Sequence, residues 1–302
     1  MNNAPSLREL VDLYLLRCEV EGKSPRTVIA YRGTLTRFLG TVDIQRAEDV
    51  TQEHVYAYLG GCRSLAAESR HRYFREVRCF FNWLVSSDYL EKSPFRGIKN
   101  VRLPQRIVQP FAPEEIMRVL EACGTDPIGL RDRAIVMLLL DTGARCSEVV
   151  QLDLSEVDLV SGRVRILHGK GNKQRVVSFA GTCLAAIESY LEVRGREPGP
   201  LFVTSDGHGS LQAGARLKIH GLQGTMRRLS ERSGVSKVHA HRFRHTFATW
   251  AIQHDARELD VQYLLGHSSP DMVRRYSSSY RSEQAALRHF AFSPADQMLG
   301  TR

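Results

Sequence analysis

The chain has 302 residues, of which 42% are hydrophobic and 25% are charged, a composition that suits a globular protein of two domains. No apolar run reaches the roughly 20 residues of a membrane helix, and the start MNNAPSLREL lacks the pattern of a signal peptide, so we expect a cytoplasmic protein with no membrane partner. The formal net charge of +9 favours a polyanionic partner, and six scattered cysteines without a CxxC pair predict free thiols rather than a disulfide or zinc framework.

Residues 1–95 are patterned as four helices, which predicts an all-helical domain. The last and longest helix runs from about Ser64 to Val85, with its apolar residues on one stripe. The first three helices are marked by start signals, namely Ser6 with Glu9, Ser24 before Pro25, and Thr51.

The next stretch, 96–112, is rich in proline and shows little periodicity, which predicts an extended linker between domains. Its basic residues suit a strap that lies along a polyanion. The helix before it also carries basic side chains, which either grip phosphates or only solvate the helix surface: Arg70, Arg72, Arg75 and Arg78.

Residues 113–302 predict a second domain of mixed structure. Pro113 starts a helix, and a second helix covers roughly Leu130 to Thr142. Alternating apolar residues then predict two short strands, Arg163 to Leu167 and Gln174 to Phe179. The pattern therefore changes from purely helical to helices with a small sheet.

Two glycines and an asparagine around a lysine join these strands, which predicts a hairpin that projects Lys170. Helices are predicted again from Thr182 to the end of the chain. The last of them is a helical tail over about residues 282–302, capped by Ser282 and closed by Pro294. Such a short helix needs a docking surface, either on its own domain or on a neighbouring copy.

Positive charge is concentrated in residues 201–250, which carry +6 of the net +9. A surface patch of this kind attracts phosphate backbones whatever their sequence, although a solvated helix face is the plain alternative. The basic residues of this segment are Arg216, Lys218, Arg227, Arg228, Arg232, Lys237, Arg242 and Arg244.

Four short segments of the second half hold residues suited to phosphoryl-transfer chemistry. In DTGARCSEVVQL, Glu148 follows Arg145 by three residues, a spacing that lets the carboxylate orient the guanidinium but is also that of an ordinary helix salt bridge. Lys170 lies on the glycine hairpin, and His267 precedes Tyr276 by nine residues in LLGHSSPDMVRRYSSSY. The remaining segment, HAHRFRHTFAT, places three residues on one helix face: His241, Arg244 and His245.

In this order, and in the contexts TGARxSE, GKGNKxR, HRFRHTFAT and LLGHSS followed by a tyrosine, the segments closely resemble the tyrosine recombinase (phage integrase, Xer-like) family. The resemblance covers the whole chain, with residues 1–95 similar to a helical, SAM-like core-binding domain and residues 110–285 similar to an α+β catalytic domain. It implies a mainly α fold with a small antiparallel β-sheet. Two departures are Pro270 to Val273, where relatives often have Ser/Thr-rich residues, and Tyr280, a second tyrosine near Tyr276.

The resemblance implies a site-specific recombinase, a DNA strand transferase that cleaves and rejoins duplex DNA through a 3′-phosphotyrosyl intermediate on Tyr276. The phosphotyrosyl link keeps the bond energy, so no cofactor and no metal is implied, and no P-loop is present. The implied partners are duplex DNA with inverted-repeat half-sites, a homotetramer in synapsis and an accessory DNA-bending or directionality protein, in a nucleoid-associated location. Mobile-element integration and excision is the favoured role, and chromosome dimer resolution is the alternative.

The chemistry of the reaction suits the residues that the resemblance assigns to it. Arg145 and Arg244 are able to hold the non-bridging phosphate oxygens and stabilise their extra negative charge. A phenol with a pKa near 10 needs a neighbour to take its proton, and His241 and His267 are both candidates, either for this step or for donating a hydrogen bond to the phosphate. Lys170 is the candidate acid that protonates the leaving 5′ oxygen.

Three rival interpretations use the same residues. His239, His241 and His245 have spacings that suit zinc, but no HExxH pattern is present, and cleavage that is insensitive to EDTA would exclude a metallohydrolase. A purely architectural DNA-binding protein would not need the whole set of catalytic residues. A topoisomerase with a tyrosine nucleophile would relax plasmids that lack a specific site, whereas a recombinase requires one.

Overall fold

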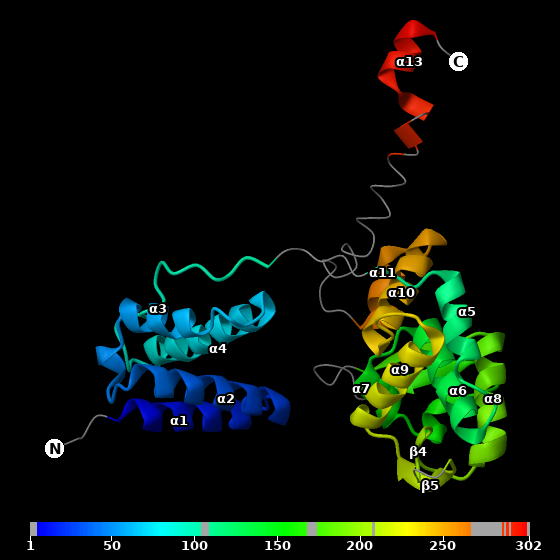
Figure 1. The fold of residues 1–302 in the computed structure, drawn as a ribbon, viewed down its shortest axis with the longest axis horizontal. Coiled ribbons are helices and arrows are strands. Elements are labelled where there is room, and N and C mark those ends of the chain that lie inside the picture. The colour runs from blue at the N-terminus through cyan, green and yellow to red at the C-terminus, as the bar shows by residue number, and fades with distance from the viewer. Residues whose placement is uncertain are drawn as a thin grey trace. The chain divides into compact units, whose positions relative to one another are not determined.

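The computed structural model describes residues 5–103, 109–167, 174–206, 209–266, 286, 288–289 and 291–300. The chain divides into two compact units, Met1–Arg106 and Ile107–Arg302, each with its own hydrophobic core (Figure 1). Within the described residues, no helix combines the length and the apolar character needed to cross a membrane.

The first unit is entirely helical in its described part. Ser6 caps the first helix as predicted, since its Oγ accepts a hydrogen bond from the Glu9 amide at 3.3 Å while the Glu9 carboxylate accepts one from the Ser6 amide at 2.7 Å. Ser24 caps the second helix through one bond of this kind, since its Oγ accepts from the Thr27 amide at 3.2 Å. The α-helices of this unit are α1 (Leu7–Val20), α2 (Pro25–Val42), α3 (Gln52–Gly61) and α4 (Ala67–Ser86).

Helix α4 begins three residues later than the sequence predicts, because residues 62–65 form turns after α3. Its predicted apolar stripe is buried and packs against α2, where Phe81 and Phe38 meet edge to face with ring centroids 5.6 Å apart. Phe95 and Ile98 also lie in this core, so the first residues of the predicted linker belong to the packed unit.

The second unit is built around α6 (Pro127–Thr142), which is buried along most of its length and packs against α8 and α10. It begins three residues before the predicted start, because Asp126 caps it by accepting from two backbone amides and Pro127 occupies the first turn. The other described helices are α5 (Pro113–Glu121), α7 (Cys146–Gln151), α8 (Gly181–Arg194), α9 (Ile219–Ser233), α10 (Ala240–Gln253), α11 (Glu258–Leu265) and α13 (Pro294–Leu299).

A three-stranded antiparallel sheet of order β1-β2-β3 lies in this unit. Strands β2 (Arg163–Ile166) and β3 (Arg175–Ser178) are the two predicted strands, each shorter than predicted, and β1 (Val157–Asp158) adds an edge. The hairpin that would join β2 and β3, with Lys170, lies outside the described residues.

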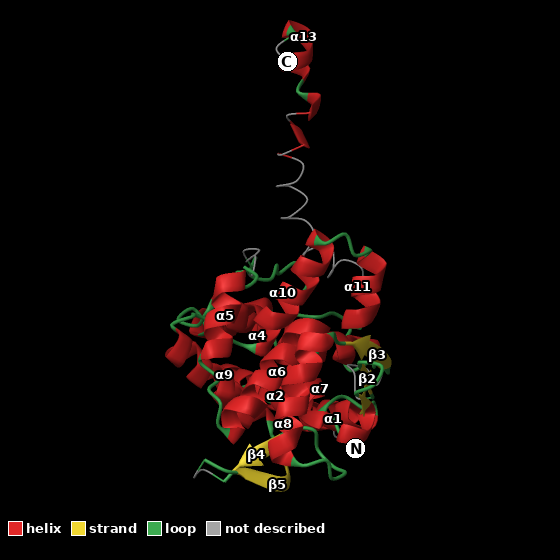
Figure 2. Cartoon of the chain, turned by 90° about the vertical axis from the view of Figure 1, so that its right-hand side faces the viewer, coloured by secondary structure: helices red, strands yellow, loops and turns green. Residues whose placement is uncertain are grey.

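A second sheet was not predicted. Strands β4 (Val203–Ser205) and β5 (Leu211–Arg216) pair antiparallel in a region where the sequence favoured helices. They lie at the end of the unit farthest from α11 (Figures 1 and 2). The predicted mainly α fold with a small antiparallel sheet is confirmed, with this two-stranded sheet in addition.

Pro294 was predicted to close the tail helix, but in the structure it starts a helix. It begins α13, whose N-cap is Ser293, immediately after helical residues 291–292. Ser282, the predicted start of the tail helix, lies outside the described residues. The tail therefore contains a helix break at Ser293 rather than a helix end at Pro294.

Candidate active site

The C-terminal end of α6 brings Arg145 into position. Gly143 ends the helix in the left-handed conformation, with φ of 60°, and a Cβ there would lie 2.7 Å from atoms of Leu265 and Phe247. Only glycine fits this close approach, because a side chain would push α6 away from α10 and α11. Arg145 follows as the N-cap residue of α7.

The predicted pair of Arg145 and Glu148 is present. Arg145 donates from its guanidinium to Glu148 Oε1 at 2.7 Å and from its backbone amide to Glu148 Oε2 at 2.7 Å. The Glu148 side chain is 1% exposed and that of Arg145 is 25% exposed. The Glu148 carboxylate is therefore buried, while part of the Arg145 side chain is exposed to solvent.

Helix α10 carries two of the other predicted residues. Arg244 is 3% exposed and donates to the Gly143 carbonyl at 2.8 Å and to the Leu265 carbonyl at 2.6 Å. His241 lies one turn earlier, where part of its side chain is open to solvent and part is covered. Its pKa is lowered by partial burial and then by the positive charges of Arg244 and Arg145, so the three residues share one electrostatic environment.

A third arginine joins this site without having been assigned a role from the sequence. Arg175 donates to both oxygens of Glu148, at 2.9 and 2.7 Å, and to the Leu264 carbonyl at 2.7 Å. Two features of the sequence could have identified Arg175 as part of this site. It ends the motif GKGNKxR, and strand alternation places it on the same face of β3 as the buried Val177.

The end of α11 is held by all three arginines. The carbonyls of three consecutive residues, Leu264, Leu265 and Gly266, accept hydrogen bonds from Arg175, Arg244 and Arg145 respectively, the last at 3.3 Å. The next residue in the chain is His267. Three of the predicted site residues lie outside the described residues: Lys170, His267 and Tyr276.

The histidines near this site have structural partners of their own. His239 is the N-cap of α10, and its Nδ1 accepts from the Arg242 amide at 3.1 Å. His245 is buried and its Nδ1 lies 3.2 Å from the Thr249 hydroxyl. In the part of the chain that the structure describes, no group of three or more His, Cys, Asp or Glu residues is arranged to hold a metal ion.

The basic segment 201–250 is only partly a surface patch. Arg242 is 8% exposed, lies 3.9 Å above the Phe111 ring and donates to Glu115 at 2.6 Å. Arg216 binds Asp153 at 2.5 Å. Counting charges along the sequence could not reveal these partners, because each lies far from its arginine in the chain. The members of the segment that stay exposed are Lys218, Arg227, Arg228, Arg232 and Lys237.

A groove runs between α9 and the start of α10, next to the arginine site. Its floor is apolar, and Arg227 and Lys237 line it together with His241. Cys146, the residue after Arg145, also lines it, so the groove reaches the active-site helix α7. Two of the exposed positive charges of the second unit, Arg227 and Lys237, therefore line the same groove as His241 and Cys146.

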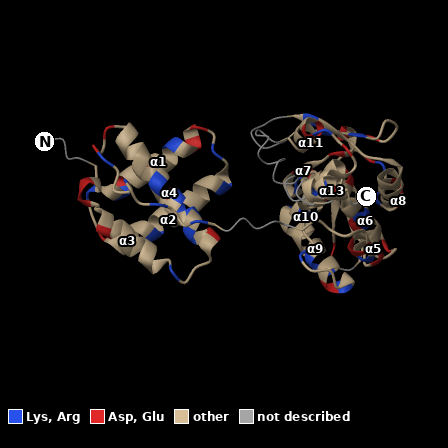
Figure 3. Cartoon of the chain, turned by 90° about the horizontal axis from the view of Figure 1, so that it is seen from above, with Lys and Arg blue, Asp and Glu red and all other residues tan. Residues whose placement is uncertain are grey.

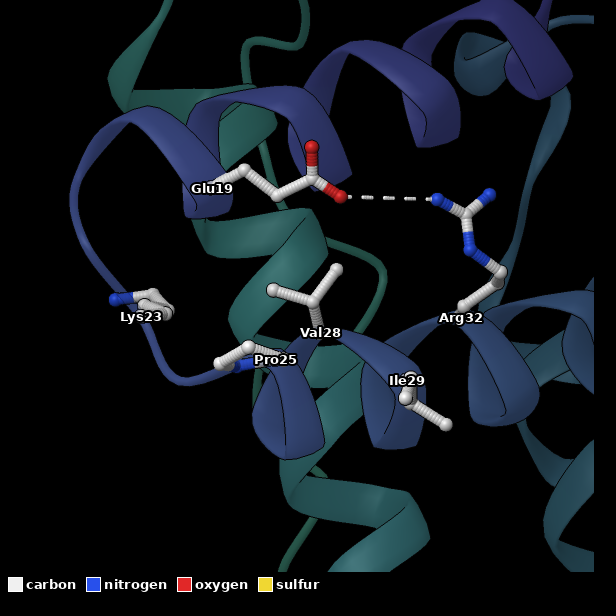
Figure 4. A pocket seen from close by; sticks show the side chains of 6 residues that line it. All are labelled: Glu19, Lys23, Pro25, Val28, Ile29 and Arg32. Atoms are coloured by element: carbon white, nitrogen blue, oxygen red, sulfur yellow. Dashed lines mark ion pairs between the residues drawn. The ribbon is translucent and has the colours of Figure 1, made fainter.

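The first unit presents a different surface. Its basic residues are coloured in Figure 3, and three arginines of α4 (Arg72, Arg75 and Arg78) are exposed. A hollow between α1 and α2 is bordered by Glu19 and Arg32, whose side chains are 4.0 Å apart and more than half exposed (Figure 4). Neither place resembles the buried arginine site of the second unit.

Comparison with known proteins agrees with this geometry. Residues 109–283 match the phage integrase family, and residues 11–88 match the N-terminal SAM-like domain of phage integrases. The tyrosine recombinases XerC of Escherichia coli (strain K12 / DH10B) and of Escherichia fergusonii are each 29% identical to the chain over 277 residues. The matched part covers 88% of this chain and 90% of each relative.

Solved structures share the fold at lower identity. XerA recombinase is 24% identical with a TM-score of 0.52, and the match covers 93% of this chain and 98% of that chain. A lambda integrase tetramer bound to a Holliday junction is 17% identical with a TM-score of 0.73, over 91% and 78% of the two chains. From the match of 109–283 and the similarity to XerC over 88% of its length, the chain belongs to the phage integrase family and is a site-specific tyrosine recombinase, a DNA strand transferase.

Proposed function

We propose that the arginine site of the second unit is the place of strand cleavage. What carries this proposal is the convergence of Arg145, Arg244 and His241 from two helices around the end of α11. Two guanidiniums suit the extra charge on the non-bridging oxygens of a phosphodiester under attack. The neutral imidazole favoured for His241 is able to accept a proton.

The remaining roles rest on the sequence. Tyr276 attacks phosphorus, its phenolic proton passes to His241 or His267, and the bond from phosphorus to the 5′ oxygen breaks. Lys170 protonates the leaving 5′ oxygen. The product is a 3′-phosphotyrosyl link, and attack by the 5′ hydroxyl of a second strand reverses the step with no cofactor.

The nucleophile is tested by two matched substitutions. Tyr276→Phe is expected to abolish covalent capture of a nicked suicide substrate while leaving DNA binding intact, because only the phenolic oxygen is lost. Tyr280→Phe removes the same atom four residues away and is expected to react normally. Full activity in Tyr276→Phe would remove the assignment.

The DNA partner is duplex with inverted-repeat half-sites, bound by both units. We propose that residues 1–95 are the core-binding domain, 96–112 the linker and 113–302 the catalytic domain with its tail. The exposed arginines of α4 and the basic groove beside α10 support binding to phosphates. Lambda integrase forms a tetramer on a Holliday junction, which supports a homotetramer in synapsis for this chain too.

The biological role has two candidates. We propose integration and excision of a mobile element, with an accessory DNA-bending or directionality protein, in the nucleoid-associated cytoplasm. Chromosome dimer resolution is the second candidate, favoured by the similarity to XerC over 88% of the chain. The DNA around the gene distinguishes them, because a site-bounded insertion supports an element and an isolated housekeeping locus supports dimer resolution.

A further inference from the structure

Glu148 is a buried carboxylate shared by two arginines. Burial alone would raise its pKa, but hydrogen bonds from Arg175 and Arg145 lower the pKa to about 2. The carboxylate is therefore charged at neutral pH. With a side chain that is 1% exposed, it has little room to change its conformation.

Arg175 is bound to this carboxylate in a geometry that only arginine supplies. Its two terminal nitrogens face the two carboxylate oxygens, and its Nε donates to the Leu264 carbonyl on α11. A lysine ammonium keeps the charge but cannot form the paired bonds and reach Leu264 at once. The Arg175 side chain is 9% exposed, so solvent replaces few of these bonds.

The end of α11 is fitted closely around Arg175. Gly266 has φ of 62°, and a Cβ on it would lie 3.2 Å from Arg175 Cδ. The same residue accepts from Arg145 through its carbonyl. Arg175 thus contacts both sides of the site, with Glu148 and Arg145 on one side and the chain that leads to His267 on the other.

We propose that Arg175 is a positioning residue for strand cleavage, which fixes the Arg145 guanidinium through Glu148 and fixes the end of α11 through Leu264. The hydrogen bonds of its guanidinium go to Glu148 and Leu264. The inference rests on the proposed role of Arg145 at the scissile phosphate. Misplacing a reacting group by about 1 Å costs roughly 10²-fold in rate, which sets the expected size of the effect.

The first test replaces Arg175 by lysine in the full chain. Single-turnover cleavage of a nicked suicide substrate at saturating protein is expected to fall about 10²-fold, while the Kd for the DNA stays unchanged. Arg163→Lys is the matched control, since Arg163 is exposed on the neighbouring strand β2, and it is expected to cleave normally. Normal cleavage by Arg175→Lys would overturn the proposal.

A second readout separates positioning from general loss of packing. A methylphosphonate at the scissile position removes the negative charge that Arg145 is proposed to face. The defect of Arg175→Lys relative to the unsubstituted protein is therefore expected to shrink about tenfold or more on this neutral substrate. A packing defect would slow both substrates equally, and that result would contradict the proposal.

The remaining outcomes are also decisive. If Arg175→Lys does not fold, Glu148→Gln serves as the test variant in its place, because it weakens the bonds that hold the same two arginines. Its cleavage defect is expected to shrink on the neutral substrate in the same way. An equal defect of Glu148→Gln on both substrates would overturn the inference. If Arg145→Ala is slow but Arg175→Lys is normal, only this inference fails. If Arg145→Ala itself cleaves normally, the proposed function of the site fails.

Discussion

The arginines of α4 and those of the arginine site are held in opposite ways. On α4 of the first unit, Arg72 and Arg78 are exposed and lie over the rings of neighbouring Tyr73 and Phe74. In the second unit, Arg175 and Arg244 are buried, and their bonds to backbone carbonyls and carboxylate hold them still. An exposed arginine contributes affinity for phosphates of any sequence, whereas a buried one sets geometry. Binding and chemistry are therefore expected to respond to different substitutions.

The largest expected effect comes from the buried site. Arg145→Ala and Arg244→Ala are each expected to slow single-turnover cleavage by about 10²–10³-fold while leaving the Kd for DNA nearly unchanged, because each removes a guanidinium that we propose to stabilise the transition state. Rates at saturating protein and binding isotherms measure the two effects separately. A loss of binding that parallels the loss of cleavage would break the comparison between the units.

A second effect concerns how the free energy of unfolding depends on pH through His245, which lies on α10. Burial, and then the charge of His241, lowers the pKa of His245 from 6.5 to about 4. The unfolded chain therefore binds this proton more tightly than the folded protein does. The free energy of unfolding accordingly has its full value above pH 6.5 and falls as the pH drops toward 4. At about 1.4 kcal/mol for each pH unit, the loss is about 3 kcal/mol.

Urea unfolding between pH 7 and pH 4 measures this loss. His245→Gln is expected to flatten that part of the stability profile, whereas His220→Gln, at an exposed position of α9, is expected to leave it unchanged. An unchanged profile in His245→Gln would show that another group is responsible.

Substitutions on the surface of the first unit are expected to have a smaller effect, and to change DNA binding but not cleavage. Arg72→Ala and Arg75→Ala together are expected to weaken DNA binding and to reduce the slope of log K against log salt by about 0.9 for each phosphate that is no longer neutralised. Cleavage at saturating protein is expected to stay the same. A slower chemical step in this variant would show that the first unit also shapes the active site.

The smallest expected change is a shift in the pKa of His241. Partial burial and the charges of Arg244 and Arg145 hold the pKa of His241 below its ordinary 6.5 in the free protein, as an NMR titration can measure. Arg145→Ala removes one of these charges and is expected to raise that pKa. Arg163→Ala, on the exposed face of β2, is expected to leave it unchanged. Equal shifts in the two variants would contradict the proximity of Arg145 and His241.

Local chemistry made much of the fold predictable. The cap formed by Ser6 and Glu9, the turn at Ser24-Pro25 and the alternation of β2 each depend on residues a few positions apart. Strand β5 was missed because its segment LQAGAR includes glycine and alanine, which carry little strand signal, and strand β4 was missed because it is only three residues long. The short-range rules therefore succeeded where a few neighbouring residues decide the structure.

The site shows the limit of such rules more clearly. The pair of Arg145 and Glu148 was predicted because its members are three residues apart, whereas Arg175 reaches Glu148 across 27 residues. Arg242 was counted as surface charge, although it binds Glu115 at a separation of 127 residues in the chain. A sequence shows that an arginine is present, but the fold determines whether it binds DNA or another residue.

We propose that strand transfer proceeds through a covalent bond between the DNA and Tyr276. It is tested most directly by trapping the protein on a nicked suicide substrate, digesting the adduct and identifying the DNA-linked peptide by mass spectrometry. We expect a single phosphotyrosyl bond on Tyr276, formed equally well in the presence of EDTA. An adduct on Tyr280, or cleavage that leaves no covalent link, would contradict it.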